Sequence, residues 1–246
     1  MAEYQRIEKP PRTAIVRGAD RDAIANALFG ESEPTPLDVA GRGSVGSFVM
    51  SDGEGVLRKC RRGGLVGKLV NEGYLLKNRP LAEFRVHEAL YDTGVSVPEP
   101  LGVMWEKHLF VFRGAIATRR LDTVGLRQWI ENHAAEESSV LTIIGSLIRS
   151  MHDAGVYHAD LHVENILVEG EKAYLIDFDN ASPQASLSGV QRARNLLRLR
   201  RSFQKWGLPM SAYEGILAGY GSITIPSWLD TAYRLKAKAS DLVAAS

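Results

Sequence analysis

The chain has 246 residues, enough for one or two compact domains with a buried core. Hydrophobic residues make up 45% and charged residues 24% of it, a balance typical of a globular protein rather than a disordered one. The formal net charge of +1 provides no overall positive field for nucleic acid, so any basic surface must be local.

One cysteine, Cys60, excludes an internal disulfide framework and fits a reducing compartment. The first residues, Met1 to Arg6, lack the apolar segment of a secretory signal. No run approaches the ~18 apolar residues that a membrane-spanning helix needs. We therefore expect a cytoplasmic protein.

The first part of the chain is rich in predicted strands. Residues 1–36 are interpreted as a partly ordered lead-in with a short helix near Asp20–Phe29. A meander and one helix follow, with the predicted elements Leu37–Ala40, Ser47–Met50, Val56–Cys60, the helix Leu81–Thr93, Gly102–Trp105 and His108–Arg113. Ile116–Leu121 is interpreted as a connector.

The second part is mainly helical. Apolar residues from Val140 to Met151 keep helical spacing, Ile166–Val168 and Tyr174–Ile176 read as a hairpin, and helices follow from Gln191. Strands followed by helices predict an α+β, bilobal fold with a cleft. The N-lobe is expected over residues 1–115 and a reduced C-lobe over residues 116–246.

The sharpest motif joins three oxygen-bearing side chains. Asp160 and Asn165 lie in His-Ala-Asp-Leu-His-Val-Glu-Asn, and Asp177 follows the returning strand of the hairpin. Because a hairpin brings its two ends together, these side chains are expected to converge. Phosphoryl transfer needs this set: Asp160 as the base for the attacking hydroxyl, and Asn165 and Asp177 as ligands of Mg²⁺ on ATP.

The block resembles the H-R-D-x-x-x-x-N and D-F-G elements of the protein-kinase-like superfamily. The structural alternative is a buried polar loop whose carboxylates cap backbone amides. His158 and His162 could instead form a metal pair, but no Glu follows the first His as a zinc-peptidase helix requires.

Gly41, Gly43 and Gly46 form a G-x-G-x-x-G pattern. In a dinucleotide-binding fold this pattern opens a helix, whereas here it leads into a strand. Between strands, such a loop can place backbone N–H groups over phosphates. The alternative is a flexible turn.

A kinase also needs a cation on the third strand and an acid on the next helix to pair with it. Arg58 is the preferred cation, with Lys68 as a second candidate. Glu83 lies at the edge of the apolar stripe of its helix and is the expected partner. Glu88 is expected to point into solvent.

Further segments resemble the lipopolysaccharide kinases, and most of all the 3-deoxy-D-manno-octulosonic acid (Kdo) kinases of Gram-negative bacteria. The similar segments are Arg61–Leu69, Ala82–Arg85, Val97–Pro100, His158–Leu161, Ile176–Asp179 and Asn195–Ser202, within residues 37–206. Asn180 departs from the pattern, which has a basic residue there.

The resemblance implies ATP-dependent phosphorylation of the Kdo 4-hydroxyl on a lipid A precursor. It places the protein peripherally on the cytoplasmic face of the inner membrane, and it gives Arg61, Arg62 and Lys68 as candidate substrate-binding residues. A basic stripe at Arg194, Arg198, Arg201 and Lys205 suits an anionic acceptor or lipid headgroup, although it could equally be a solvated helix face.

Three rival hypotheses remain at this point. An atypical small Ser/Thr protein kinase would share the H-x-D-x-x-x-x-N core, although only 69 residues follow Asp177 and no A-P-E element occurs among them. A nucleotide-binding pseudokinase is the second rival, and its support is Arg58 at the position where kinases usually have Lys. An aminoglycoside-type kinase would need an acidic pocket, which the basic stripe argues against.

Overall fold

A computed structural model describes residues 4–37, 45–60, 78–108, 111–133 and 138–244. The chain divides into two compact units, Met1–Tyr91 with Pro98–Leu121 and Asp92–Val97 with Asp122–Ser246. The first is rich in strands and the second in helices, as the sequence predicts.

In the first unit the described strands form one antiparallel sheet with the order β1-β2-β6-β7-β5-β4-β3. The strands are β1 Tyr4–Lys9, β2 Arg12–Arg17, β3 Thr35–Pro36, β4 Val45–Met50, β5 Gly53–Lys59, β6 Pro100–His108 and β7 Val111–Arg119. The helices of this unit are α1 Arg21–Phe29 and α2 Arg79–Asp92.

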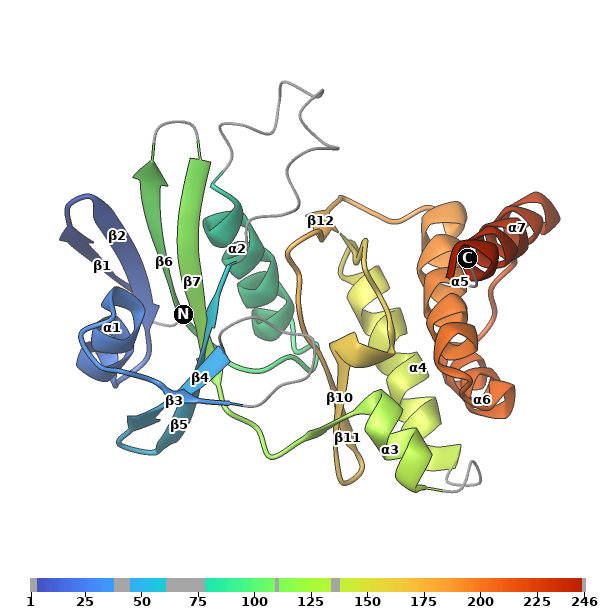
Figure 1. Cartoon of the computed structure of the whole chain (residues 1–246), viewed down its shortest axis with the longest axis horizontal. Coiled ribbons are helices and arrows are strands. Elements are labelled where there is room, and N and C mark those ends of the chain that lie inside the picture. Colours follow the sequence, from blue (N-terminus) through green and yellow to red (C-terminus); the bar gives the residue numbers. More distant parts are fainter. Residues whose placement is uncertain (1–3, 38–44, 61–77, 109–110, 134–137, 245–246) are drawn as a thin grey trace. The chain divides into compact units, whose positions relative to one another are not determined.

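The two helices cover opposite faces of this sheet (Figure 1). Strand residues alternate between the faces: Ala115 and Ala117 of β7 pack in the core with α1, whereas Ile116 between them packs against Phe84 of α2. The same alternation on β5 puts Leu57 on the α1 side, so Arg58 is directed to the α2 side.

Two predictions for the first unit are wrong. Residues 4–36 are not a lead-in outside the sheet, because β1 and β2 form a hairpin that extends the sheet through β6; the short helix expected near Asp20–Phe29 is confirmed as α1. β1 is an edge strand with exposed or half-buried residues throughout, so it shows no apolar alternation in the sequence. The expected connector from Ile116 is strand β7, where small alanines take buried places between β6 and β5.

The second unit contains helices around two small sheets. Its helices are α3 Leu126–Asn132, α4 Ser138–Asp153, α5 Gly189–Trp206, α6 Met210–Tyr220 and α7 Ser227–Ala244. The strands β8 Val124–Gly125, β10 Ile166–Glu169 and β11 Lys172–Leu175 form one sheet, and β9 Val156–Tyr157 pairs with β12 Ser182–Pro183. The predicted hairpin is present as β10–β11.

The helices α4 and α6 approach each other closely. A Cβ on Gly145 of α4 would lie 2.0 Å from the carbonyl oxygen of Ile216, and one on Gly219 of α6 would lie 2.0 Å from that of Thr142. The glycines therefore allow contact between the two backbones. This contact brings the end of α6 beside the C-terminal turn of α4, where His152 lies. None of the described helices is long and apolar enough to cross a membrane.

Candidate active site

One face of α5 holds the loop between β9 and β10, which contains Asp160. Asn195 accepts a hydrogen bond from the backbone N–H of His158 (3.2 Å) and donates one to its carbonyl oxygen (2.8 Å). Seven residues along the same helix, the hydroxyl of Ser202 accepts a bond from the backbone N–H of Val163 at 3.1 Å. The loop is thus attached to α5 at two points.

Asn195 is itself held by a buried histidine. Because its amide nitrogen donates to His158, its oxygen accepts from Nε2 of His152 at 3.0 Å. The other ring nitrogen, Nδ1, then accepts from the hydroxyl of Tyr220 on α6 at 2.9 Å. Burial lowers the pKa of His152 to about 4, so this network is neutral at pH 7.

His158 connects the loop with the segment that carries Asp177. Its Nδ1 accepts from the backbone N–H of Asp160 at 3.3 Å, so its Nε2 carries the proton and donates to the carbonyl oxygen of Ile176 at 3.1 Å. Burial is the main cause that lowers the pKa of His158, and the negative charges of Asp177 and Asp160 both act against it. His158 thus connects the backbone of Asp160 with that of Ile176, the residue before Asp177.

Asn165 adds a second connection between the same segments. Its side-chain amide donates to the carbonyl oxygen of Asp160 at 3.0 Å, and its backbone oxygen accepts from the N–H of Ile176 at 3.1 Å. Since the amide group is planar, its oxygen is directed away from Asp160. Asp177 has a φ of 66°, a left-handed conformation that Asp adopts more readily than most residues.

The carboxylate of Asp160 lies between two basic side chains. Nε2 of His162 is 3.7 Å from one oxygen, and Nη1 of Arg198 is 3.5 Å from the other. The pKa of Asp160 is lowered, chiefly by His162 and also by the charge of Arg198, while burial opposes the shift. Asp160 is therefore ionised at neutral pH, as a proton acceptor must be.

The two histidines of the motif do not form a metal pair. His158 uses both ring nitrogens in the bonds described above, and Nδ1 of His162 accepts from the backbone N–H of Glu164 at 3.2 Å. Over the part of the chain that the structure describes, no group of three or more His, Cys, Asp or Glu side chains could hold a metal ion.

The first unit contains the expected ion pair of Arg58 with Glu83. Glu83 is buried, with a side chain that is 3% exposed, while the side chain of Arg58 is 28% exposed. Arg58 forms this pair, and its neighbour Lys59 does not, because side chains alternate along β5 and only Arg58 of the two faces α2. Roles for both residues in nucleotide binding stay predictions.

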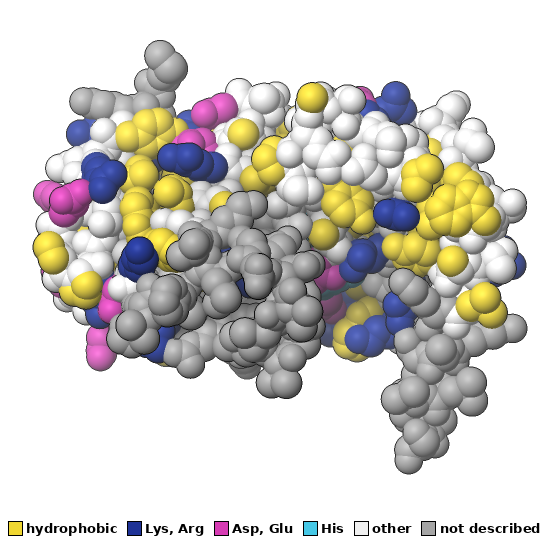
Figure 2. Space-filling view, turned by 90° about the horizontal axis from the view of Figure 1, so that it is seen from above, with side chains coloured by type: hydrophobic (Ala, Val, Ile, Leu, Met, Phe, Trp, Pro, Cys, Tyr) yellow, Lys and Arg dark blue, Asp and Glu magenta, His cyan; other side chains and the backbone are white. Residues whose placement is uncertain are grey.

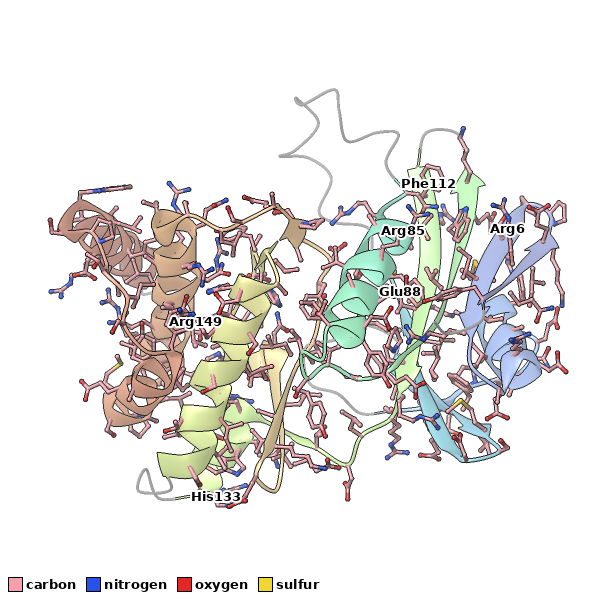
Figure 3. The ribbon with its side chains drawn as sticks, turned by 180° about the vertical axis from the view of Figure 1, so that it is seen from behind. Arg6, Arg85, Glu88, Phe112, His133 and Arg149 are labelled. Atoms are coloured by element: carbon pink, nitrogen blue, oxygen red, sulfur yellow. The ribbon has the colours of Figure 1, made fainter. Side chains whose placement is uncertain are left out.

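Glu88 is not directed into solvent. It forms an ion pair with Arg17 of β2, with 3.7 Å between Nη1 and Oε1, and it accepts a hydrogen bond from Tyr4 of β1. It thus connects α2, on which Figure 3 labels it, to the edge of the sheet. The expectation of a solvated side chain is wrong because the sequence did not predict the β1–β2 hairpin.

The glycine pattern is only partly described. Gly46 lies in β4, which pairs with β3, so the pattern leads into a strand and does not open a helix. A Cβ on Gly46 would lie 2.7 Å from Cβ of Pro34, which gives this glycine a packing reason. Gly41 and Gly43, like Arg61, Arg62 and Lys68, lie outside the described residues.

Sequence reasoning missed the roles of His152, Asn195 and Ser202. The last two could have been found, because each is a polar residue on the apolar face of α5, beside Leu196, Leu199 and Phe203, which are fully buried. Polar side chains in such places need hydrogen-bond partners.

A pocket of about 490 Å³ in the second unit, near Trp129, His133 and Gly170, has none of the candidate site residues in its described lining.

The model of the lipopolysaccharide kinase (Kdo/WaaP) family matches residues 33–220. The chain belongs to this family. It is therefore a kinase, and it uses a nucleotide as phosphoryl donor.

Individual relatives agree with this assignment. The chain is 38% identical over 196 residues to a 3-deoxy-D-manno-octulosonic acid kinase of Vibrio cholerae, covering 76% of this chain and 81% of that protein. It is 34% identical over 196 residues to a protein of the same name from Stenotrophomonas maltophilia, covering 77% of each.

A solved structure of WaaP in complex with acyl carrier protein matches 88% of this chain and 90% of that one. The TM-score is 0.60 and the sequence identity 16%. The match shows the fold, and the predicted α+β, protein-kinase-like fold is confirmed.

Proposed function

We propose that this kinase transfers the γ-phosphoryl group of ATP to the 4-hydroxyl of a Kdo residue on a lipid A precursor. The names of its relatives support Kdo as the acceptor. The observation that carries the proposal is the connection of Asp160 to Asn165 and, through His158, to the residue before Asp177.

Asp160 acts as the general base in this proposal. Its carboxylate accepts the proton of the acceptor hydroxyl as that oxygen bonds to the γ-phosphorus. The bond from the γ-phosphorus to the bridging oxygen breaks, and ADP leaves. Arg58, positioned by Glu83, supplies the positive charge that phosphates require.

The residues present fit a magnesium ion. Mg²⁺ takes hard oxygen ligands, and with nucleotides it is held by few protein groups because phosphate and water complete its shell. The amide oxygen of Asn165 and the carboxylate of Asp177 are ligands of this kind, and the hydrogen bond to Asp160 orients the amide. When bound, the ion neutralises charge on the phosphates.

We further propose that the protein works peripherally on the cytoplasmic face of the inner membrane, where a lipid-linked acceptor would be reached. Exposed tryptophans support surface attachment: Trp206 is 43% and Trp228 is 58% exposed. Indole rings favour the membrane–water interface, and cations such as Arg127 and Lys205, which lie over the ring of Trp206, favour anionic headgroups. Figure 2 shows hydrophobic side chains beside Lys and Arg on the face that it draws.

The test is a transfer reaction with purified protein, labelled ATP, Mg²⁺ and a Kdo-containing lipid A precursor. We expect the lipid to gain the mass of one phosphoryl group, and the Asp160→Asn variant to give far less product. Label that enters only a generic protein substrate would instead support a protein kinase. Nucleotide binding without turnover on any acceptor would support a pseudokinase.

A further inference from the structure

The arginines of α5 differ in whether their guanidinium groups form close ion pairs with carboxylates. Arg192 and Arg200 form close ion pairs with aspartates, at 2.6 Å to Asp153 and at 2.5 Å to Asp230. Their side chains are 21% and 16% exposed. These two arginines attach α5 to its neighbours.

Arg198 is different. Among the described residues it pairs with the carboxylate of Asp160 at 3.5 Å, longer than an N–H···O hydrogen bond. In the part of the chain that the structure describes, its buried Nε has no hydrogen-bond partner, which is also true of Arg200, so the two arginines differ in the length of the ion pair and in exposure. The side chain is 39% exposed. A guanidinium has five donors, so Arg198 keeps hydrogen-bonding capacity next to the base.

The position of Arg198 relative to Asp160 is fixed by its own helix. Asn195 and Ser202, one turn before and one turn after it, hold the loop on both sides of Asp160. A substrate hydroxyl bonded to Asp160 must lie about 3 Å from the carboxylate. The groups next to that hydroxyl are then within reach of the guanidinium.

We propose that Arg198 binds the carboxylate of the acceptor sugar while Asp160 holds the hydroxyl that is phosphorylated. This inference rests on the proposed function and adds a specificity-determining residue to it. An ulosonic acid carries its carboxylate on C2, two ring carbons from the 4-hydroxyl. A base and a guanidinium side by side match such a pair of groups, and a planar guanidinium is the side chain best shaped for a carboxylate.

The alternative ligand for Arg198 is the phosphate of the donor nucleotide, which offers the same anionic oxygens. The two assignments predict different results when the arginine is removed. Affinity for the acceptor sugar falls if Arg198 binds its carboxylate, and affinity for the nucleotide falls if Arg198 binds its phosphate. We therefore compare Arg198→Gln with wild type in binding and in turnover. Arg6→Gln is the charge-matched control, since Arg6 is an exposed residue of β1 in the first unit (Figure 3).

Binding is measured first by calorimetry, without nucleotide, using a Kdo-lipid A precursor and its carboxyl methyl ester. We expect Arg198→Gln to weaken binding of the acid about tenfold to a hundredfold, the range for a lost hydrogen bond to a charged group. Wild type should bind the ester about as weakly as the variant does. Arg198→Lys should recover part of the loss, and thermal unfolding checks that each variant is folded.

The turnover arm uses the same lipids with ATP. We expect the loss in Arg198→Gln to appear in the KM for the acceptor, with the KM for ATP unchanged. An equal loss of acid and ester binding, or a loss confined to the KM for ATP, would overturn the inference. If the wild-type protein binds the acid through Arg198 but does not phosphorylate it, the proposed function is refuted. The assignment of Arg198 to the carboxylate is then still supported.

Discussion

Arg58 in the first unit is held by a charged partner, whereas His158 in the second unit is held by neutral groups. Glu83 is a buried carboxylate opposite a guanidinium. Asn195 and His152 are buried but uncharged. A charged partner depends on the charge of its neighbour, while a neutral network depends on the direction of each hydrogen bond. The two regions should therefore respond differently to mutation and to pH.

The largest effect is expected at Asp160, which the neutral network positions. Asp160→Ala should slow phosphoryl transfer about 10²–10⁴-fold, the usual result of losing a general base. Because its contacts with Arg198 and His162 are long and half exposed, the thermal unfolding midpoint should change little. Single-turnover rates with saturating ATP measure the first quantity. A variant with nearly normal rates would show that another group is the base.

Removing one charge of the ion pair in the first unit should be costly for stability. Arg58→Ala leaves Glu83 buried without its guanidinium, and we expect a loss of about 3 kcal/mol in the free energy of unfolding. The double variant with Glu83→Gln should recover much of this loss. Urea unfolding of the two singles and the double measures the coupling. Losses that simply add would contradict a coupled pair.

The buried histidines of the two units provide a pH test of the comparison. Burial lowers the pKa of His87 in the first unit and of His152 in the second, in each case to about 4. In the unfolded chain the pKa of a histidine is 6.5. Between pH 4 and pH 6.5 the unfolded chain therefore binds more protons than the folded chain does. The free energy of unfolding should be highest above pH 6.5 and fall as the pH is lowered towards 4.

Each histidine can contribute at most about 3 kcal/mol to that fall. His87→Gln keeps a donor for the carbonyl oxygen of Pro98, which His87 contacts at 2.6 Å. This variant should flatten the profile measured by urea unfolding at several pH values. An unchanged slope would mean that His87 is not the titrating group.

The neutral network should yield a smaller loss of stability than the ion pair does. Asn195→Ala removes both bonds to His158 and the acceptor of His152, with an expected loss of about 2 kcal/mol in the free energy of unfolding. Turnover should fall as well, because the loop loses one of its attachments to α5. Ser146→Ala is the control, since its hydroxyl donates to the backbone oxygen of Gly219 at an exposed place. Normal turnover in Asn195→Ala would show that the bonds of Asn195 are not needed to position the loop.

Local patterns predicted much of this molecule. The β10–β11 hairpin, α4 and the ion pair of Arg58 with Glu83 follow from apolar periodicity over a few residues. β1 could not be predicted in this way, because a solvent-exposed edge strand lacks apolar alternation. Neither could the contact of Asn195 with His158, which joins residues 37 positions apart and depends on tertiary packing.

The smallest effect, at Glu88, separates the sequence-based interpretation from the structural one. A solvated glutamate would tolerate replacement by alanine with almost no change in stability. The structure instead pairs Glu88 with Arg17, whose side chain is 9% exposed, so we expect Glu88→Ala to lower the free energy of unfolding by about 1 kcal/mol. Glu171→Ala, in the exposed turn after β10, is the control. Equal stability of the two variants would mean that the β1–β2 hairpin gains nothing from its contacts with Glu88.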